Sequence, residues 1–309
     1  MQYRRLGRAG IKVSAVSLGS WLTYGGSVGA EGARACVRAA LDAGINHFDT
    51  ADAYQGGQAE VVLRQALEGV DRSALVIATK VYWPTGPGPN DRGTSRKHLL
   101  ESVDRCLRRL GTDYVDILYC HRFDDETDIE ETVFALNDLV QQGKVLYAGV
   151  SEWPAHRIKE ARGIQRRLHL RALAASQPAY NMLSRGIERE VLPVCREEGV
   201  GLIVFSPLAQ GVLTGKYRTG EPAPAGSRGA GNERLVREEN LRRVERLRPI
   251  AEQAGIPLAQ LALAWVLRLP EISSALIGAS RPEQVAENVQ AADIRLTPDV
   301  VAAVEEALK

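Results

Sequence analysis

The stretch INHFDTADAYQGGQAEVVL, residues 45–63, passes from strand to helix through a single loop. An apolar run ends at Asp49, a Gly-rich loop carries Tyr54, and apolar residues then recur at helical spacing over 60–68. Gly69 follows this pattern in the manner of a helix stop. The stretch therefore predicts a β-strand, a loop and an α-helix in direct succession.

Similar units follow one another along the chain. Strands are expected at Ala15–Leu18, Asn46–Asp49, Leu75–Thr79, Tyr114–Tyr119, Val145–Val150, Ala174–Gln177, Leu202–Phe205 and Ala275–Ile277. Amphipathic helices are expected between them, for example at Glu31–Ala43, Glu60–Glu68, Arg96–Leu110, Asp128–Gln142, Trp153–Gln165, Arg189–Glu198 and Pro257–Arg268. Strands that alternate with helices favour a parallel sheet, and this number of them favours a sheet closed on itself.

An open, doubly wound sheet is the alternative architecture, but it would usually carry a GxGxxG loop after its first strand. The chain has LGSW there, residues 18–21. We therefore predict an α/β fold, a (β/α)8 TIM barrel, preceded by an N-terminal β-hairpin of Tyr3–Leu6 and Ile11–Val13. No linker or low-complexity segment divides the chain, so residues 1–309 are expected to form a single domain.

The composition argues against several classes of protein. The 309 residues are 45% hydrophobic and 25% charged, with a formal net charge of +1, so no bulk basic field would attract nucleic acid or anionic lipid. The four cysteines lack CxxC or metal-ligand spacing and are expected as buried thiols, without a metal site. The N-terminus lacks a signal-peptide core, and no apolar run approaches membrane length. A cytoplasmic protein with neither nucleic-acid nor membrane partners is expected.

Polar side chains stand at the C-terminal ends of several predicted strands. Asp49, Lys80 and His121 each terminate an apolar run, and Tyr54 lies in the loop after the second strand. Taken singly, Asp49 reads as a cap, Tyr54 as a loop aromatic and His121 as an exposed loop residue. Lys80 lies too close to the core to be unpaired, and Asp49 on the neighbouring strand is its expected partner. On a barrel all four would project onto one rim, where active sites lie.

Carbonyl reduction is the chemistry that unites these four residues. Hydride attack on a carbonyl carbon leaves negative charge on the oxygen, which must then be protonated. Tyrosine, with an ordinary pKa of ~10, is a poor acid unless a nearby cation favours its phenolate. Lys80 can supply that charge, oriented by Asp49, while His121 donates a hydrogen bond to the carbonyl oxygen. Tyr54 is therefore the predicted general acid.

Several motifs together resemble the aldo-keto reductases, NADPH-dependent enzymes on a (β/α)8 barrel. FDTADAY resembles the segment with the family's Asp and Tyr, IATK the strand with its Lys, and DILYCHR the strand with its His. GTSRKHLLESVDRCLRRLGTDYVDILYCHR, FSPLAQGVLTGKY and IGASRPEQVAEN further resemble the branch that contains the potassium-channel β subunits. The resemblance covers essentially the whole chain and implies a reductase of aldehydes or ketones.

The resemblance also implies which residues act. The catalytic residues would be Asp49, Tyr54, Lys80 and His121. NADPH or NADP would be bound by Ser20, Trp21, Asp49, Ser151, Gln177, Phe205, Ser206, Pro207, Leu208, Ala209, Gly211, Lys216, Arg228, Gly278, Ser280, Arg281, Gln284, Glu287 and Asn288. Independently of the resemblance, SRPEQVAEN places Ser280 and Arg281 at a helix start, which favours a phosphate. An ordinary N-cap at Ser280 explains the same pattern equally well.

The chain departs from the channel-subunit pattern in several places. It has His121 where those subunits carry Asn, and so keeps the residue of active reductases. Glu152 stands where a basic residue would follow the nicotinamide-contacting serine, which leaves that contact in doubt. The long N-terminal extension of some channel subunits is not expected here. A regulatory subunit that binds NADP and docks on a membrane channel, and a Schiff-base aldolase with Lys80 as nucleophile, remain as alternatives.

Aromatic residues are expected to line the mouth of the site. They are Trp21, Tyr24, Tyr54, Tyr82 and Trp83, and they suit small aldehydes, dicarbonyls and aryl aldehydes. The sequence does not select among these small carbonyl substrates. It also leaves open whether the protein forms a homo-oligomer.

Overall fold

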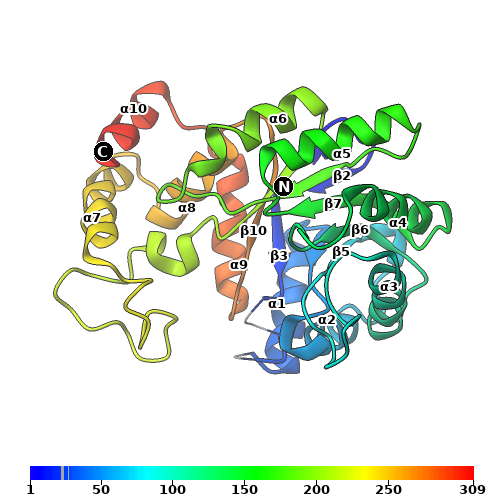
Figure 1. Cartoon of the computed structure of the whole chain (residues 1–309). Helices are drawn as coiled ribbons and strands as arrows, with labels where there is room; N and C mark the ends of the chain where they lie inside the picture. Colours follow the sequence, from blue (N-terminus) through cyan, green and yellow to red (C-terminus); the bar gives the residue numbers. More distant parts are fainter. Residues whose placement is uncertain (22–23, 27) are drawn as a thin grey trace.

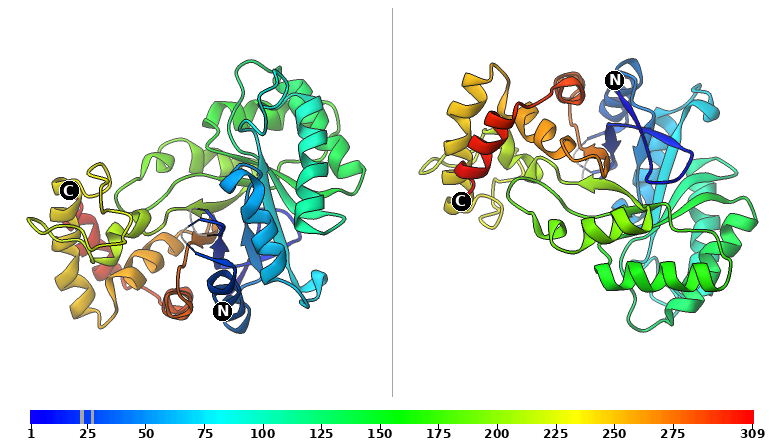
Figure 2. Two further views of the ribbon diagram at one scale, coloured as in Figure 1. Left: turned by 90° about the horizontal axis from the view of Figure 1, so that it is seen from below. Right: turned by 90° about the horizontal axis from the view of Figure 1, so that it is seen from above.

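Eight parallel strands form a closed barrel in the computed structural model, which describes residues 1–21, 24–26 and 28–309 (Figures 1 and 2). The strands pair in the order β10-β3-β4-β5-β6-β7-β8-β9, with β10 closing onto β3. Their bounds are β3 (Val16–Gly19), β4 (His47–Asp49), β5 (Val76–Val81), β6 (Val115–Cys120), β7 (Val145–Ser151), β8 (Ala175–Gln177), β9 (Gly201–Phe205) and β10 (Ile272–Ile277). The predicted (β/α)8 barrel is confirmed.

Helices cover the outside of the strands (Figure 1). Those between the strands are α1 (Ala30–Asp42), α2 (Gln58–Ala66), α3 (Arg96–Leu110), α4 (Ile129–Gln141), α5 (Ala155–Arg167), α6 (Val191–Glu198), α7 (Glu238–Gln253) and α8 (Leu258–Leu267). Local signals set several ends: the Ser95 side chain accepts from the His98 N–H at the start of α3, and Gly111 ends it at φ +64°. α9 (Pro282–Val289) and α10 (Pro298–Ala307) complete the chain.

Alternation along each strand divides the apolar residues into two cores. Val76 and Ala78 on β5 face the barrel interior, together with Ile117 and Tyr119 on β6, whereas Ile77 packs outward against the helices. Because side chains alternate between the two faces of a strand, Lys80 also points toward the interior. The four cysteines are buried free thiols, as expected: Cys36, Cys106, Cys120 and Cys195.

The N-terminal hairpin lies against the N-terminal ends of the barrel strands. β1 (Tyr3–Arg5) and β2 (Lys12–Ser14) pair antiparallel, which confirms the predicted hairpin. Gly7 has φ +56°, and a Cβ there would lie 2.3 Å from the Gly199 carbonyl oxygen. Only glycine therefore allows the turn to approach the start of β9. The hairpin closes this end of the barrel and leaves the opposite rim for the site.

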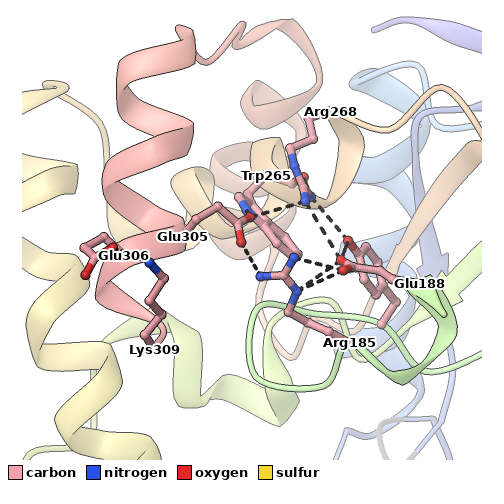
Figure 3. A network of polar contacts seen from close by, with 8 residues as sticks. Arg185, Glu188, Trp265, Arg268, Glu305, Glu306 and Lys309 are labelled. Carbon is pink, nitrogen blue, oxygen red and sulfur yellow. Dashed lines mark hydrogen bonds and ion pairs between the residues drawn. The ribbon is translucent and has the colours of Figure 1, made fainter.

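The C-terminal helix α10 is held by a cluster of charged and aromatic side chains (Figure 3). Arg185, before the 3₁₀ turn η3 (Gly186–Glu188), forms ion pairs with Glu188 and with Glu305 of α10. The Arg268 guanidinium lies 3.6 Å from the ring centre of Trp265, whose indole N–H donates to Glu305 at 3.1 Å. The cluster ties α10 to α8 and to the segment after β8.

One feature of the helices bears on membranes. Among the described residues, no single helix is long and apolar enough to cross a bilayer. Within the same residues, α7 and α8 pass that test of length and composition only as a pair, and the pair is bent by 92° at its junction. α8 is buried along its whole length, because its apolar residues pack against β10 and the neighbouring helices.

Closure of the barrel predicts that it unfolds as one cooperative unit. A chain cut after Ser151 separates β7 from β8 and β3 from β10, which leaves four open sheet edges. We expect fragments 1–151 and 152–309, expressed separately, to lack cooperative thermal unfolding by circular dichroism. A fragment that melts cooperatively by itself would contradict the single-domain prediction.

Candidate active site

Lys80 and Asp49 form a buried ion pair at the C-terminal rim of the barrel. Each side chain is 1% exposed, and the Lys80 ammonium contacts Asp49 Oδ1 and donates to the Thr50 carbonyl oxygen at 2.8 Å. The other Asp49 oxygen accepts from the Gln177 side-chain amide at 2.8 Å. The predicted pairing is therefore present, although β5 extends to Val81 and Lys80 lies within the strand rather than beyond it.

The pair holds a positive charge beneath the cavity. Burial alone would lower the pKa of Lys80, but Asp49 and Tyr54 together outweigh it, so the pKa is raised above its ordinary value. A Schiff-base lysine needs a lone pair on nitrogen. An ammonium that is held by two acceptors has no lone pair on its nitrogen. This geometry therefore disfavours the aldolase alternative.

Tyr54 lies directly over this charge. It opens the short turn η1 (Tyr54–Gly57), and its ring centre is 4.9 Å from Lys80 Nζ. Burial raises the pKa of Tyr54, and Lys80 opposes that rise. In the free protein the phenol therefore keeps its proton, while a cation stands ready to stabilise the phenolate.

His121 forms an adjacent wall of the site. It follows β6, and its ring meets that of Tyr54 edge-on with centroids 5.7 Å apart. Burial, with Lys80 and then Arg122, lowers the pKa of His121 to about 2. The imidazole is therefore neutral at ordinary pH, and one ring nitrogen carries a hydrogen that can be donated. Its Nδ1 has no partner among the residues that the structure describes.

A cavity of about 1010 Å³ opens above these residues. Most residues predicted for catalysis or cofactor binding line it: Trp21, Asp49, Tyr54, His121, Ser151, Gln177, Phe205, Ser206, Pro207, Leu208, Gly211, Lys216, Arg228, Gly278, Ser280, Arg281, Gln284, Glu287 and Asn288. Three do not reach its surface: Lys80 lies beneath Tyr54, Ser20 is buried at the end of β3, and Ala209 lies within a turn. Within the described ranges, no three His, Cys, Asp or Glu side chains could hold a metal ion together.

The loop after β9 turns through several positive φ angles at the edge of the cavity. Leu208 has φ −98° and ψ 17°, and Ala209 and Gln210 follow at φ +47° and +54°. The Ala209 N–H donates to the Ser206 carbonyl and the Gly211 N–H to the Leu208 carbonyl, both at 2.9 Å, so these two groups are used within the loop. Lys216 and Arg228 line the cavity near this loop. These cations suit a ligand with phosphates.

The segment after β10 corrects one alternative from the sequence. The N-cap of α9 is Arg281, with no side-chain cap, and not Ser280. Instead, the backbone N–H of Ser280 donates to the Gln284 side chain at 2.8 Å. Ser280, Arg281 and Gln284 all line the cavity at the start of α9, where a phosphate is favourable.

Glu152 departs from the expected pattern because it serves the backbone. Its φ is +55°, and its carboxylate accepts from the Ala179 N–H at 2.6 Å. Two residues on, the Asn181 side chain donates to the Ser206 carbonyl at 2.9 Å. Glu152 thus braces the segment that supports the start of the loop after β9, and it does not line the cavity.

The sequence analysis missed several residues of the cavity. Gln210, Thr214 and Leu276 line it, as does Arg122 directly after His121. Gln210 has φ +54° in the loop after β9, a conformation that no sequence signal announced. Arg122 had a signal, because it follows a strand-end residue that was already singled out.

Comparison with known proteins identifies the family. The model of the Aldo/keto reductase family matches residues 15–309, so the chain belongs to the aldo/keto reductases. A protein of Arabidopsis thaliana named "Probable voltage-gated potassium channel subunit beta" is 45% identical over 321 residues, with 100% of this chain and 97% of that protein covered. The L-glyceraldehyde 3-phosphate reductase of Escherichia coli (strain K12) is 42% identical over 303 residues, with 94% and 87% covered.

Membership defines the class of protein. The chain is similar to both relatives across nearly its whole length, and the expected family is confirmed. Aldo/keto reductases are oxidoreductases that generally use NAD(P)H. The class of reaction is therefore carbonyl reduction.

A second buried charge cluster supports the turn that carries Tyr54. Glu60 accepts from the Thr79 hydroxyl and from Arg109 Nε, both at 2.6 Å. Arg109 passes so close to Gly57 that a Cβ there would lie 2.8 Å from its Nε. Asp52 is buried in this cluster, with no hydrogen-bond partner for either carboxyl oxygen among the described side chains and backbone. Burial, and then Glu60, raise the pKa of Asp52 from its ordinary 3.8 to about 7.

Asp52 should make stability depend on pH. The folded protein holds this proton up to a pH of about 7, whereas the unfolded chain releases it near 3.8, so stability falls as pH rises between them. The contribution is at most about 1.4 kcal/mol per pH unit. Asp52→Asn resembles the protonated acid and should flatten this slope in urea unfolding at pH 5, 6, 7 and 8. Asp125→Asn, at an exposed aspartate, serves as the control. Parallel curves for Asp52→Asn and wild type would contradict the assignment.

Proposed function

We propose that the protein reduces aldehydes or ketones to alcohols with NADPH, and that Tyr54 is the general acid. The observation that carries the proposal is the buried Lys80–Asp49 pair beneath Tyr54 in the floor of a large cavity. The proposal includes a small carbonyl compound as substrate and a cytoplasmic location, with neither nucleic acid nor membrane as a partner. A homo-oligomer is compatible with it.

The chain's own residues suit the cofactor. NADPH, when bound, supplies the hydride that reduces the carbonyl carbon. Ser151 and Gln177 would hold the nicotinamide amide and Phe205 would pack on its ring, since all three line the cavity beside Asp49. The loop 206–211 and Lys216 would bind the pyrophosphate. Arg228, Arg281 and the start of α9 would bind the adenosine and its 2′-phosphate.

Proton delivery follows from the electrostatics. Tyr54 gives its proton to the carbonyl oxygen as negative charge develops there, and Lys80 stabilises the phenolate that remains. His121, neutral because of its depressed pKa, donates a hydrogen bond to the same oxygen. Asp49 keeps Lys80 charged and oriented. Each residue thus acts only when charge appears on the oxygen.

A regulatory role is the second candidate function. The name of the Arabidopsis thaliana relative favours it, since it describes a potassium-channel subunit. His121 favours catalysis, because a neutral imidazole can polarise a carbonyl group. Affinity capture of a membrane channel by the full chain, with no turnover of any aldehyde by the purified protein, would support the regulatory role instead.

Tyr54→Phe tests the general acid. The change removes one hydroxyl and keeps the ring, so packing and NADPH binding should be nearly preserved. Aldehyde-dependent NADPH oxidation should fall by about 10²–10⁴-fold, the usual contribution of a positioned acid. NADPH fluorescence on binding reports that the variant is folded and loaded. A loaded variant that turns over at the wild-type rate would falsify the mechanism.

His121→Asn provides a graded comparison. Asn retains a hydrogen-bond donor but not the imidazole, so turnover should fall while NADPH binding remains measurable. The same aldehyde assay and fluorescence titration apply. If NADPH binding is lost together with turnover, His121 instead supports the cofactor site and its assignment to the carbonyl oxygen fails.

Arg281→Ala tests the choice of cofactor. If Arg281 contacts the 2′-phosphate, its loss should weaken NADPH by about 1–3 kcal/mol and NADH much less, because only NADPH carries that group. Fluorescence titrations with both cofactors measure the difference. Equal weakening of both, or a wild type that prefers NADH, would refute the assignment.

A further inference from the structure

Arg122 presents an unneutralised charge to the cavity. It follows His121 directly, it is half-buried, and it lines the cavity together with Trp83 and Tyr54. Its guanidinium carbon lies 5.5 Å from the ring centre of Trp83, and its Nη1 donates to the His121 carbonyl oxygen at 2.5 Å. No carboxylate lies within ion-pair distance of it in the part of the chain that the structure describes. Most of its five donors therefore remain available.

The position of Arg122 separates it from the other cations of the cavity. Lys216 and Arg228 follow β9, and Arg281 follows β10. In the barrel order, β6 is four strands from β10 around either side of the ring and three from β9. Arg122, which follows β6, therefore stands on the opposite side of the rim. The cavity has one group of cations for cofactor phosphates and one separate arginine across from them.

The surroundings of Arg122 favour an anion. A guanidinium is weakly hydrated and offers a planar fork that matches carboxylate and phosphate oxygens. Here the guanidinium lies beside the Trp83 ring, and Tyr54 and His121 line the same cavity. A molecule whose carbonyl lies at Tyr54 and His121 would thus carry its nearby substituents past Trp83 toward Arg122.

We propose that Arg122 binds an anionic group of the carbonyl substrate, a carboxylate or a phosphate, and so makes the enzyme selective for acidic aldehydes. The inference rests on the proposed reductase function and adds its substrate class. A simpler role exists: through its bond to the His121 carbonyl, Arg122 can merely brace the loop after β6. That role would affect charged and neutral aldehydes alike.

Matched substrates separate the two roles. 4-Carboxybenzaldehyde and 4-carbamoylbenzaldehyde have nearly the same shape and differ in charge. Wild type should prefer the carboxylate, and Arg122→Met should reduce the ratio of the two kcat/KM values by about tenfold or more, mainly through the KM of the acid. Arg122→Lys should retain part of the preference. Glycolaldehyde phosphate against glycolaldehyde repeats the comparison for phosphate and shows which anion is read.

Arg218→Met is the matched control, because it removes one exposed arginine beyond the cavity lining and should leave the ratio unchanged. A wild type without preference for either anion, or an Arg122→Met variant that loses activity equally on acid and amide, overturns the proposal. If wild type reduces no aldehyde, the reductase function fails, and calorimetric titration of the NADP-loaded protein with 4-carboxybenzyl alcohol decides. Binding of the carboxylate that is lost in Arg122→Met and is not seen with the carbamoyl alcohol supports the anion site. If the wild-type protein does not bind the carboxylate in this way, the anion site is overturned.

Discussion

The ion pair between Lys80 and Asp49 is the constraint on which the site depends. Two opposite charges at 1% exposure persist because each satisfies the other and because Thr50 and Gln177 take the remaining hydrogen bonds. Removing one partner would strand a buried charge, typically at about 3–5 kcal/mol. The pair also needs β4 and β5 side by side, so the closed barrel and the site stabilise each other.

The rest of the site is arranged around that buried cation. The ammonium favours the phenolate of Tyr54 and adds to the burial that keeps His121 neutral, and it is itself too well paired to act as a nucleophile. Burial has the opposite effect on Tyr54: it raises the pKa, so the phenol keeps its proton in the free protein. The Glu60–Arg109 pair packs behind the turn that carries Tyr54 and fixes its backbone. Tyr54 therefore stays aligned with the cavity.

Support of a similar kind continues around the rim to the cofactor loop. Glu152 holds the Ala179 N–H and Asn181 holds the Ser206 carbonyl, while the cluster around Trp265 ties the same segment to α10 (Figure 3). The loop after β9 is thus held in place by side chains outside the cavity lining. Because such supports lie in loops after different strands, the closed barrel is what brings them together.

By itself, the sequence determined the strands, most helices, the hairpin and the four polar residues at the rim, because the hydrophobic period and glycine stops are local signals. The family motifs added the prediction of the cofactor-binding residues, most of which line the cavity. Only the tertiary structure decided that Lys80 lies within β5, that Arg281 and not Ser280 caps α9, and that Glu152 serves the backbone. It also decided that Arg122, in the loop after β6, lines the same cavity as Lys216, Arg228 and Arg281. These facts depend on strand register and on contacts between distant segments, and no pattern of neighbouring residues encodes them.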